Sequence, residues 1–174
     1  MRLFVAVNPP PATAERLLEV QAELRRLSLQ GNFSLRDNLH LTLAFLGELD
    51  APDAAIDAMN ALEFTAFELF VDRIGRGHHH GRDLWWACVA ESRPLKDLQR
   101  ELVAELAAHR CPFDDRPYRP HITLARQVVC NYGAWPIEPF AWPVSQVDLM
   151  WSQRVDGELT YTPIFSREAL SWGG

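Results

Sequence analysis

Two short segments of nearly identical sequence hold the residues best suited to chemistry. Residues 40–44 read His-Leu-Thr-Leu-Ala, and residues 121–125 read His-Ile-Thr-Leu-Ala. Along an extended strand, successive side chains point to opposite faces, so each histidine shares a face with the threonine two residues on. The aliphatic residues share the other face. The sequence therefore predicts two strands that are anchored by apolar side chains and present an imidazole beside a hydroxyl.

Such a set suits the in-line opening of a cyclic phosphodiester, provided that the two strands face each other across a cleft. One neutral histidine can take a proton from water while the other, protonated, gives a proton to the departing ribose oxygen. The histidine pKa of about 6.5 lets both forms coexist near neutral pH. Threonine hydroxyls can hold the non-bridging oxygens as charge builds. This chemistry requires no metal and no cofactor, and we expect none.

The alternative for either segment alone is a histidine and a threonine that hydrogen-bond at a strand edge. A single His-x-Thr pattern is weak, because short matches arise often by chance. The repetition of five positions in the two halves of the chain is what favours catalysis.

At these residues the chain resembles the two-histidine phosphoesterases, and within them the bacterial and archaeal RNA 2′,3′-cyclic phosphodiesterases, historically called 2′-5′ RNA ligases. Residues 38–47 and 120–126 are similar to the two signatures of that family, and residues 2–7, 84–86 and 161–163 resemble its other strands. The resemblance implies an α+β, bilobal fold. Two pseudo-symmetric lobes, each an antiparallel sheet flanked by helices, would enclose a central cleft.

The resemblance also implies roles. His40 would be the proton donor to the leaving oxygen, and His121 the proton acceptor that activates water. Thr42 and Thr123 would bind the phosphate. The family reaction converts the 2′,3′-cyclic phosphate of an RNA end to a 2′-phosphomonoester. Its reversal with a 5′-hydroxyl end would account for the ligase name.

Arg126 fits the family pattern His-x-Thr-x-x-Arg as a further phosphate-binding residue. On a regular strand its side chain points away from His121 and Thr123, so a bulge or a strand end is needed to bring it to the phosphate. A surface arginine is the alternative. By the same alternation, Phe45 is assigned to the core, with base stacking as the alternative.

Other polar residues remain open to two interpretations. His78, His79 and His80 lie between glycines and are typical of a polar loop, with metal pickup or RNA contact as the alternative. Four residues near the motifs could contact RNA at the rim of the cleft or serve only in loop packing: Arg36, Arg116, Tyr118 and Arg119.

Hydrophobic periodicity predicts the order βαβαββαβββ. We expect strands at 3–7, 39–45, 65–74, 84–90, 121–125, 144–151 and 159–166. Helices are expected from a cap at Thr13 to about 29, from Asp50 to 62, and from Pro94 to about 109. Residues 75–81 are predicted as a loop within a hairpin, and 136–143 as a proline-rich passage.

The length of 174 residues predicts one compact domain over 1–174, and the resemblance implies that this domain is bilobal and catalytic. A formal net charge of −6 disfavours binding of long nucleic acid by bulk electrostatics, leaving RNA 3′ ends or small cyclic-phosphate nucleotides as partners. Cys88, Cys111 and Cys130 form no CxxC pair and are odd in number, which favours a reduced, cytoplasmic location. No apolar run is long enough to span a membrane. We expect a monomer, because the cleft lies within one chain.

Several substrates and one different class of function stay open on the sequence alone. A small cyclic nucleotide, an ADP-ribose cyclic phosphate or a 2′-5′-linked oligonucleotide could replace the RNA end. The rival from another class is a non-catalytic module that binds RNA ends in the same cleft. Two complete His-x-Thr pairs favour turnover, because a binding module has no need of two proton-transfer groups.

Overall fold

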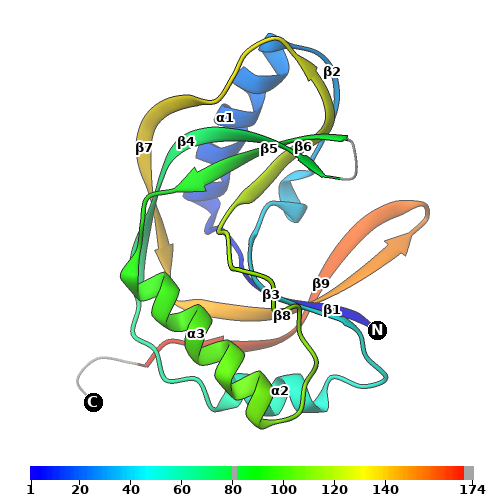
Figure 1. Ribbon diagram of the computed structural model, residues 1–174, viewed down its shortest axis with the longest axis vertical. Coiled ribbons are helices and arrows are strands. Elements are labelled where there is room, and N and C mark those ends of the chain that lie inside the picture. The colour runs from blue at the N-terminus through cyan, green and yellow to red at the C-terminus, as the bar shows by residue number, and fades with distance from the viewer. Residues whose placement is uncertain (80–81, 171–174) are drawn as a thin grey trace.

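The chain folds into two antiparallel sheets, which lie one above the other in Figure 1. The structure, a computed structural model, describes residues 1–79 and 82–170. The lower sheet has the order β3 (Leu41–Glu48), β1 (Arg2–Val7), β8 (Gln146–Val155), β9 (Glu158–Glu168). The upper sheet has the order β2 (Ser28–Phe33), β6 (Ile122–Cys130), β5 (Arg82–Val89), β4 (Phe67–His79), β7 (Trp135–Val144). The predicted α+β fold with two lobes is confirmed.

Helices α1 (Pro11–Leu27) and α3 (Arg93–Ala108) each follow a strand of one sheet but pack on the other sheet. Helix α1 follows β1 of the lower sheet but packs on β2, β6 and β7 of the upper one. Helix α3 follows β5 of the upper sheet but packs on β3 and on α2 (Asp53–Asn60) below (Figure 1). Each sheet is therefore covered by the helix that precedes the other sheet's His-x-Thr motif in the sequence.

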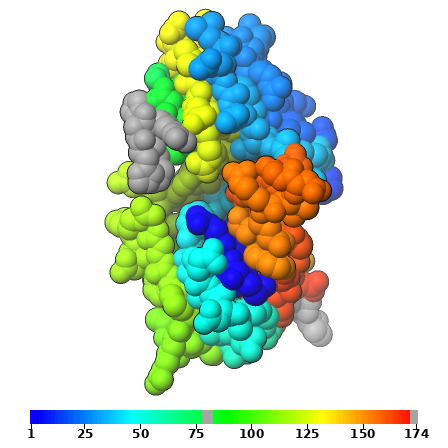
Figure 2. All heavy atoms as spheres, turned by 90° about the vertical axis from the view of Figure 1, so that its right-hand side faces the viewer, coloured from blue at the N-terminus to red at the C-terminus, as the bar shows by residue number. Residues whose placement is uncertain are grey.

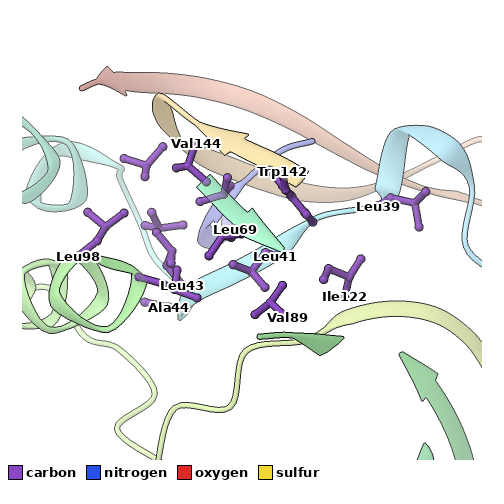
Figure 3. Close-up of a cluster of buried hydrophobic side chains, with 14 of the residues drawn as sticks. Leu39, Leu41, Leu43, Ala44, Leu69, Val89, Leu98, Ile122, Trp142 and Val144 are labelled. Atoms are coloured by element: carbon purple, nitrogen blue, oxygen red, sulfur yellow. The ribbon is translucent and has the colours of Figure 1, made fainter. Parts of the chain in front are cut away.

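One apolar core joins the two sheets. Figure 3 shows Leu41 and Leu43 of β3 beside Ile122 of β6 and Trp142 of β7. Leu41, Ile122 and Leu124 are fully buried, so the aliphatic faces of both motif strands point into this core. The predicted apolar anchoring of the motifs is confirmed, and it leaves the histidine faces directed away from the core.

Two strands were not predicted, and both lie at edges of the upper sheet. Strand β7 contains Pro136, Pro139 and Pro143 and pairs only with β4. Proline has no N–H to give to a ladder, so an edge strand tolerates it where a central strand does not. Strand β2 occupies the opposite edge and is largely exposed, so its sequence lacks the alternation that identifies a half-buried strand.

Two of the three predicted helix starts were wrong. Helix α1 begins at Pro11, with Pro10 in the cap position, because proline supplies the φ angle of a first turn. Thr13 is instead buried within the helix, and its hydroxyl donates to Ala141 O at 3.1 Å. Helix α2 begins at Asp53, three residues after the predicted start at Asp50, and has no side-chain cap. Helix α3 begins as predicted, with Leu95 N donating to the hydroxyl of Ser92.

The predicted hairpin of β4 and β5 is confirmed, but its loop is shorter than predicted. Strand β4 continues through residues 75–79, paired with β5. Its glycines make room for a large side chain of the neighbouring strand: a Cβ atom on Gly75 or Gly77 would lie within 2.4 Å of the Trp86 indole. The loop prediction for His80 and Gly81 lies outside the described residues.

Two further findings bear on stability and location. Cys88, Cys111 and Cys130 are buried and unpaired. Within residues 1–79 and 82–170, no helix is long and apolar enough to cross a membrane. With no disulfide among its cysteines, the fold depends on its apolar core.

Leu41 provides a direct test of this core. Leu41→Ala should lower the free energy of unfolding by about 2–5 kcal/mol, because a fully buried side chain at the junction of the sheets is lost and a cavity remains. Urea unfolding followed by circular dichroism measures the change. The matched control is Leu29→Ala: Leu29 is 78% exposed, and the change should stay within about 0.5 kcal/mol. Equal effects of the two substitutions would contradict this account of the core.

Candidate active site

The two motif histidines are held in the same way by the backbone. Nδ1 of His40 lies 2.8 Å from Asn38 O, and Nδ1 of His121 lies 2.8 Å from Arg119 O. A carbonyl oxygen can only accept, so Nδ1 carries the hydrogen in both rings. In the neutral tautomer Nε2 is then unprotonated. Each histidine can therefore accept or release a proton at Nε2 while its ring stays anchored through Nδ1.

The histidines differ in their surroundings. His40 is partly buried: its Nε2 lies 2.9 Å from the Thr42 hydroxyl, and its ring contacts Phe4 and Tyr161 at centroid distances of 4.9 and 5.2 Å. His121 is exposed, and its ring packs against Trp86 at 5.6 Å. One histidine thus lies in an aromatic surrounding and the other meets solvent.

The pKa of His40 responds to its burial and to the charges of His121 and Arg126. Burial lowers the pKa of His40, and the hydrogen bond to Asn38 O opposes this shift. Positive charge on His121 and Arg126 lowers the pKa of His40 further. Such effects fade beyond a screening length of about 10 Å, so both groups lie close to His40 across the gap between the lobes. In Figure 2 the surface is hollowed between the yellow segment of the upper lobe and the blue and cyan segments of the lower lobe.

A β-bulge in each motif strand determines which later residues face the same side as the histidines. In the pairing of β6 with β5, Thr123 and Ala125 face consecutive residues, so Leu124 is the extra residue. In the pairing of β3 with β1, Leu43 is extra in the same way. A bulge resets the alternation of side chains, so the residues after it return to the face of the histidine and threonine.

The bulge in β6 brings Arg126 to the strand face of His121 and Thr123, which regular alternation would not do. Leu124 and Ala125 are both buried, and Arg126 then lies exposed on the face of His121 and Thr123. Its charge also opposes the rise that burial causes in the pKa of Tyr161, as expected for a guanidinium directed at the other lobe.

The bulge in β3 corrects the interpretation of Phe45. This residue was assigned to the core by alternation, but it is 48% exposed. Its ring lies 6.1 Å from that of Phe4, which also contacts His40. Phe45 therefore belongs to the histidine face.

Glutamines from helices α1 and α3 bind the carbonyls of the two bulges. Gln21 of α1 is buried, and its Nε2 donates to Leu124 O at 3.0 Å. Gln99 of α3 approaches Leu43 O through Nε2 at a longer 3.5 Å. Because a bulge disrupts the ladder, its backbone groups need partners from elsewhere. The two helices thus support the bulges in equivalent ways.

The segment that precedes each motif is hydrogen-bonded to the other motif. The hydroxyl of Tyr118, three residues before His121, donates to Thr42 O at 2.8 Å. The hydroxyl of Ser34, six residues before His40, donates to Thr123 O at 3.2 Å. Each bond ties the segment that leads into one motif to the backbone of the other motif.

The remaining candidates from the sequence are only partly near the site. Arg36 forms an ion pair with Glu15, and Arg116 with Asp114. Arg119 is exposed beside His121. Among the residues that the structure describes, no group of three histidine, cysteine, aspartate or glutamate side chains could hold a metal ion. The side chains of the three consecutive histidines lie outside that description.

Five residues near the site had no role in the sequence-based prediction: Phe4, Gln21, Ser34, Trp86 and Tyr161. A signal existed for Gln21, since it is a polar residue on the apolar stripe that Leu17 and Leu24 define in α1. The aromatic residues carried no such signal, because aromatic residues in strands are most often core residues.

A two-lobed α+β fold with a His-x-Thr pair from each lobe defines the class of two-histidine phosphoesterases. The sequence profile of the 2′-5′ RNA ligase superfamily matches residues 9–156. The chain belongs to this superfamily.

Curated relatives and solved structures agree with this assignment. The chain is 31% identical to the RNA 2′,3′-cyclic phosphodiesterase of Escherichia coli over 94% of this chain and 93% of the relative. It is 33% identical to the enzyme of the same name from Thermus thermophilus, over 81% and 80% of the two chains. The crystal structure of E. coli LigT complexed with 3′-AMP is similar, with a TM-score of 0.82, 27% identity and 98% coverage of both chains.

The charge of Arg126 should be visible in the titration of His40. Arg126→Gln should raise the pKa of His40, because the imidazolium no longer faces a neighbouring positive charge. The pH dependence of the His40 ring signals in NMR spectra, assigned with His40→Gln, measures the shift. Arg119→Gln is the control and should leave that titration unchanged. An unchanged titration in Arg126→Gln would show that Arg126 does not face His40.

Tyr118→Phe should separate positioning from substrate contact. The substitution removes the hydroxyl that donates to Thr42 O and should lower the free energy of unfolding by about 0.5–1.5 kcal/mol. We expect kcat for a cyclic phosphate substrate to fall while KM changes little, because the lost bond orients the motif rather than the substrate. Tyr132→Phe, at an exposed tyrosine, is the matched control. A change confined to KM would instead place Tyr118 in contact with the substrate.

Proposed function

We propose that the chain hydrolyses the 2′,3′-cyclic phosphate at RNA 3′ ends to a 2′-phosphomonoester. The observation that carries this proposal is the pair of histidines anchored through Nδ1, each followed by a threonine on the same strand face. The relatives named RNA 2′,3′-cyclic phosphodiesterase support the choice of substrate.

The reaction assigns one role to each group. Nε2 of His121 takes a proton from water, whose oxygen attacks phosphorus in line with one ribose oxygen. As the P–O bond to that oxygen breaks, Nε2–H of protonated His40 gives it a proton. Thr42, Thr123 and the Arg126 guanidinium hold the non-bridging oxygens as negative charge builds. One water is consumed, and two proton transfers return the pair to its starting charge after exchange with solvent.

The role of His40 as the acid depends on the bound phosphate. Its pKa is lowered in the free protein by burial and by the charges of His121 and Arg126. A bound phosphate carries negative charge between these groups and favours the protonated form of His40. The exposed His121 is the histidine that water reaches more easily. This arrangement supports His121 as the base.

Reversal of the same steps would give a 2′-5′ linkage when a 5′-hydroxyl of RNA takes the place of water. Small cyclic nucleotides and 2′-5′-linked oligonucleotides present the same phosphate and are alternative substrates. A non-catalytic RNA-end binding module is the rival outside enzymes. Such a module has no use for two histidines whose Nε2 atoms are both available for proton transfer.

We further propose that the protein acts as a cytosolic monomer. Three buried, unpaired cysteines fit a reducing compartment. The residues assigned to the reaction all come from one chain, so a second copy is not needed to complete the site.

An oligonucleotide ending in a 2′,3′-cyclic phosphate tests the function directly. Wild-type protein should convert it to the 2′-phosphate, and His40→Ala or His121→Ala should each lower the rate about 10²–10⁴-fold, because each variant lacks one proton-transfer group. Product analysis by chromatography measures both the rate and the position of the phosphate. Added EDTA should leave the wild-type rate unchanged, since the reaction assigned to these residues uses no metal.

Retained activity in both histidine variants would refute the mechanism. A bell-shaped dependence of kcat/KM on pH is expected when one histidine acts as base and the other as acid. A flat profile between about pH 5 and 9 would contradict this division of roles.

A further inference from the structure

Three polar side chains form a row across the lower sheet, on the face that carries His40. Arg2 of β1 pairs with Ser152 of β8, and Ser152 pairs with Tyr161 of β9. Cross-strand partners project to the same face, and neighbouring strands lie about 4.8 Å apart. The Tyr161 ring contacts both His40 and Phe4, and Phe4 shares the face of Arg2 two residues earlier in β1. We name Arg2, Ser152 and Tyr161 the donor row.

The side chains of the donor row are available to a ligand. Among residues 1–79 and 82–170, they have no hydrogen-bond or ion-pair partner. Arg2 is exposed, and Glu48, its partner in β3, instead places its carboxylate 3.4 Å from the amine of Met1. Burial raises the pKa of Tyr161, and the charges of Arg126 and Arg2 oppose that rise, so both guanidiniums lie near the phenol oxygen. One guanidinium and two hydroxyls in a row suit a phosphate, which accepts hydrogen bonds and carries negative charge.

The donor row is displaced from the residues assigned to the reacting phosphate. Thr42 pairs with Ala6, and Arg2 lies four positions before Ala6 in β1, roughly 13 Å along the strand. The long arginine side chain spans part of this distance. The gap that remains suits the next phosphate along an RNA chain.

The proposed reaction brings the RNA chain over this part of the lower sheet. The leaving oxygen belongs to the ribose and receives its proton from His40, so the ribose lies on the His40 side. The rest of the RNA leaves that ribose through its 5′ carbon. In Figure 2 the dark-blue start of β1 and the orange hairpin of β8 and β9 border the hollow between the lobes. A chain that leaves the hollow on this side passes over the donor row.

We propose that the donor row binds the phosphate that joins the terminal nucleoside to the preceding nucleotide of the RNA. This second phosphate site makes an RNA end a better substrate than a free cyclic nucleotide, which lacks that phosphate. The inference rests on the proposed phosphodiesterase function and specifies its substrate. A single local contact of this kind is compatible with the net charge of −6, because it requires no extended basic surface.

Two substrates that differ only in the second phosphate test the proposal. Cytidine 2′,3′-cyclic phosphate has a 5′-hydroxyl, and the other substrate carries a 5′-methylphosphate on the same nucleotide, with one diester charge as in RNA. Wild-type protein should prefer the 5′-methylphosphate substrate through a lower KM. Arg2→Gln should reduce this preference roughly 5- to 10-fold, again through KM, the size expected for loss of one exposed charge-assisted contact.

Tyr161→Phe keeps the ring beside His40 and removes only the hydroxyl. It should reduce the same preference about 2- to 10-fold, as expected for loss of one hydrogen bond. A fall in kcat on both substrates in this variant would overturn the proposal, because it would place the hydroxyl at the reacting phosphate.

Arg100→Gln is the matched control for Arg2→Gln. Arg100 is 78% exposed on α3, outside the donor row, and its substitution should leave the preference at the wild-type value. An equal loss on both substrates in Arg2→Gln would contradict the second site, and so would a wild-type protein with the same KM for both. If wild-type protein opens neither substrate, the phosphodiesterase function itself fails.

Discussion

Tyr118, three residues before the second motif, and Ser34, six residues before the first, each donate a hydroxyl hydrogen to a threonine carbonyl of the other motif. These two bonds connect the backbone of each motif to the segment that leads into the other motif. They lie above a core that both sheets share, and no disulfide adds to them, since the three cysteines are unpaired. A displacement of about 1 Å between the lobes would be enough to impair in-line attack and proton transfer. The position of one histidine relative to the other therefore depends on these two hydrogen bonds.

These hydrogen bonds result from the path of the chain between the two sheets. Helix α1 packs on the upper sheet before the chain enters β3 of the lower one, and α3 packs on β3 before the chain enters β6. Each helix binds the bulge of the sheet on which it packs, through Gln21 and Gln99. Separation of the lobes would strain the bond from Tyr118, three residues before His121 of the upper lobe, to Thr42 O of the lower lobe. Loss of one such hydrogen bond costs about 0.5–1.5 kcal/mol, which opposes opening of the gap. The two lobes are consequently expected to move as one body.

The sequence predicted the shared face of each His-x-Thr pair because alternation on a strand is a local property. His40 and Thr42 needed only the rule that residues two apart share a face, and the repeat at His121 and Thr123 supplied the rest. The same rule failed at Phe45, since the bulge at Leu43 has no glycine or proline to mark it. A bulge of this kind follows from register with the neighbouring strand, which only the folded chain defines.

The errors in the elements have a similar origin. The prolines of β7 argued against a strand, and only the position of β7 at the sheet edge makes them acceptable. Thr13 looked like a cap, but the packing of α1 against Ala141 gives its hydroxyl another acceptor. In both instances a tertiary contact outweighed a local preference. The helices and strands that were predicted correctly are those whose apolar pattern meets the common core, as the stripe of α3 does.

The pKa of His40 connects stability with function. Its lowered pKa means that the folded chain binds the His40 proton more weakly than the unfolded chain, so this residue's contribution to stability falls as pH drops below about 6.5. Burial is the main cause of this lowered pKa, and the rings of Phe4 and Tyr161 contact that of His40. An anionic phosphate brings the charge that protonated His40 lacks in the free protein. In the proposed mechanism, proton uptake at His40 is thereby coupled to binding of the anionic phosphate, and an uncharged ligand in the same place would favour neutral His40.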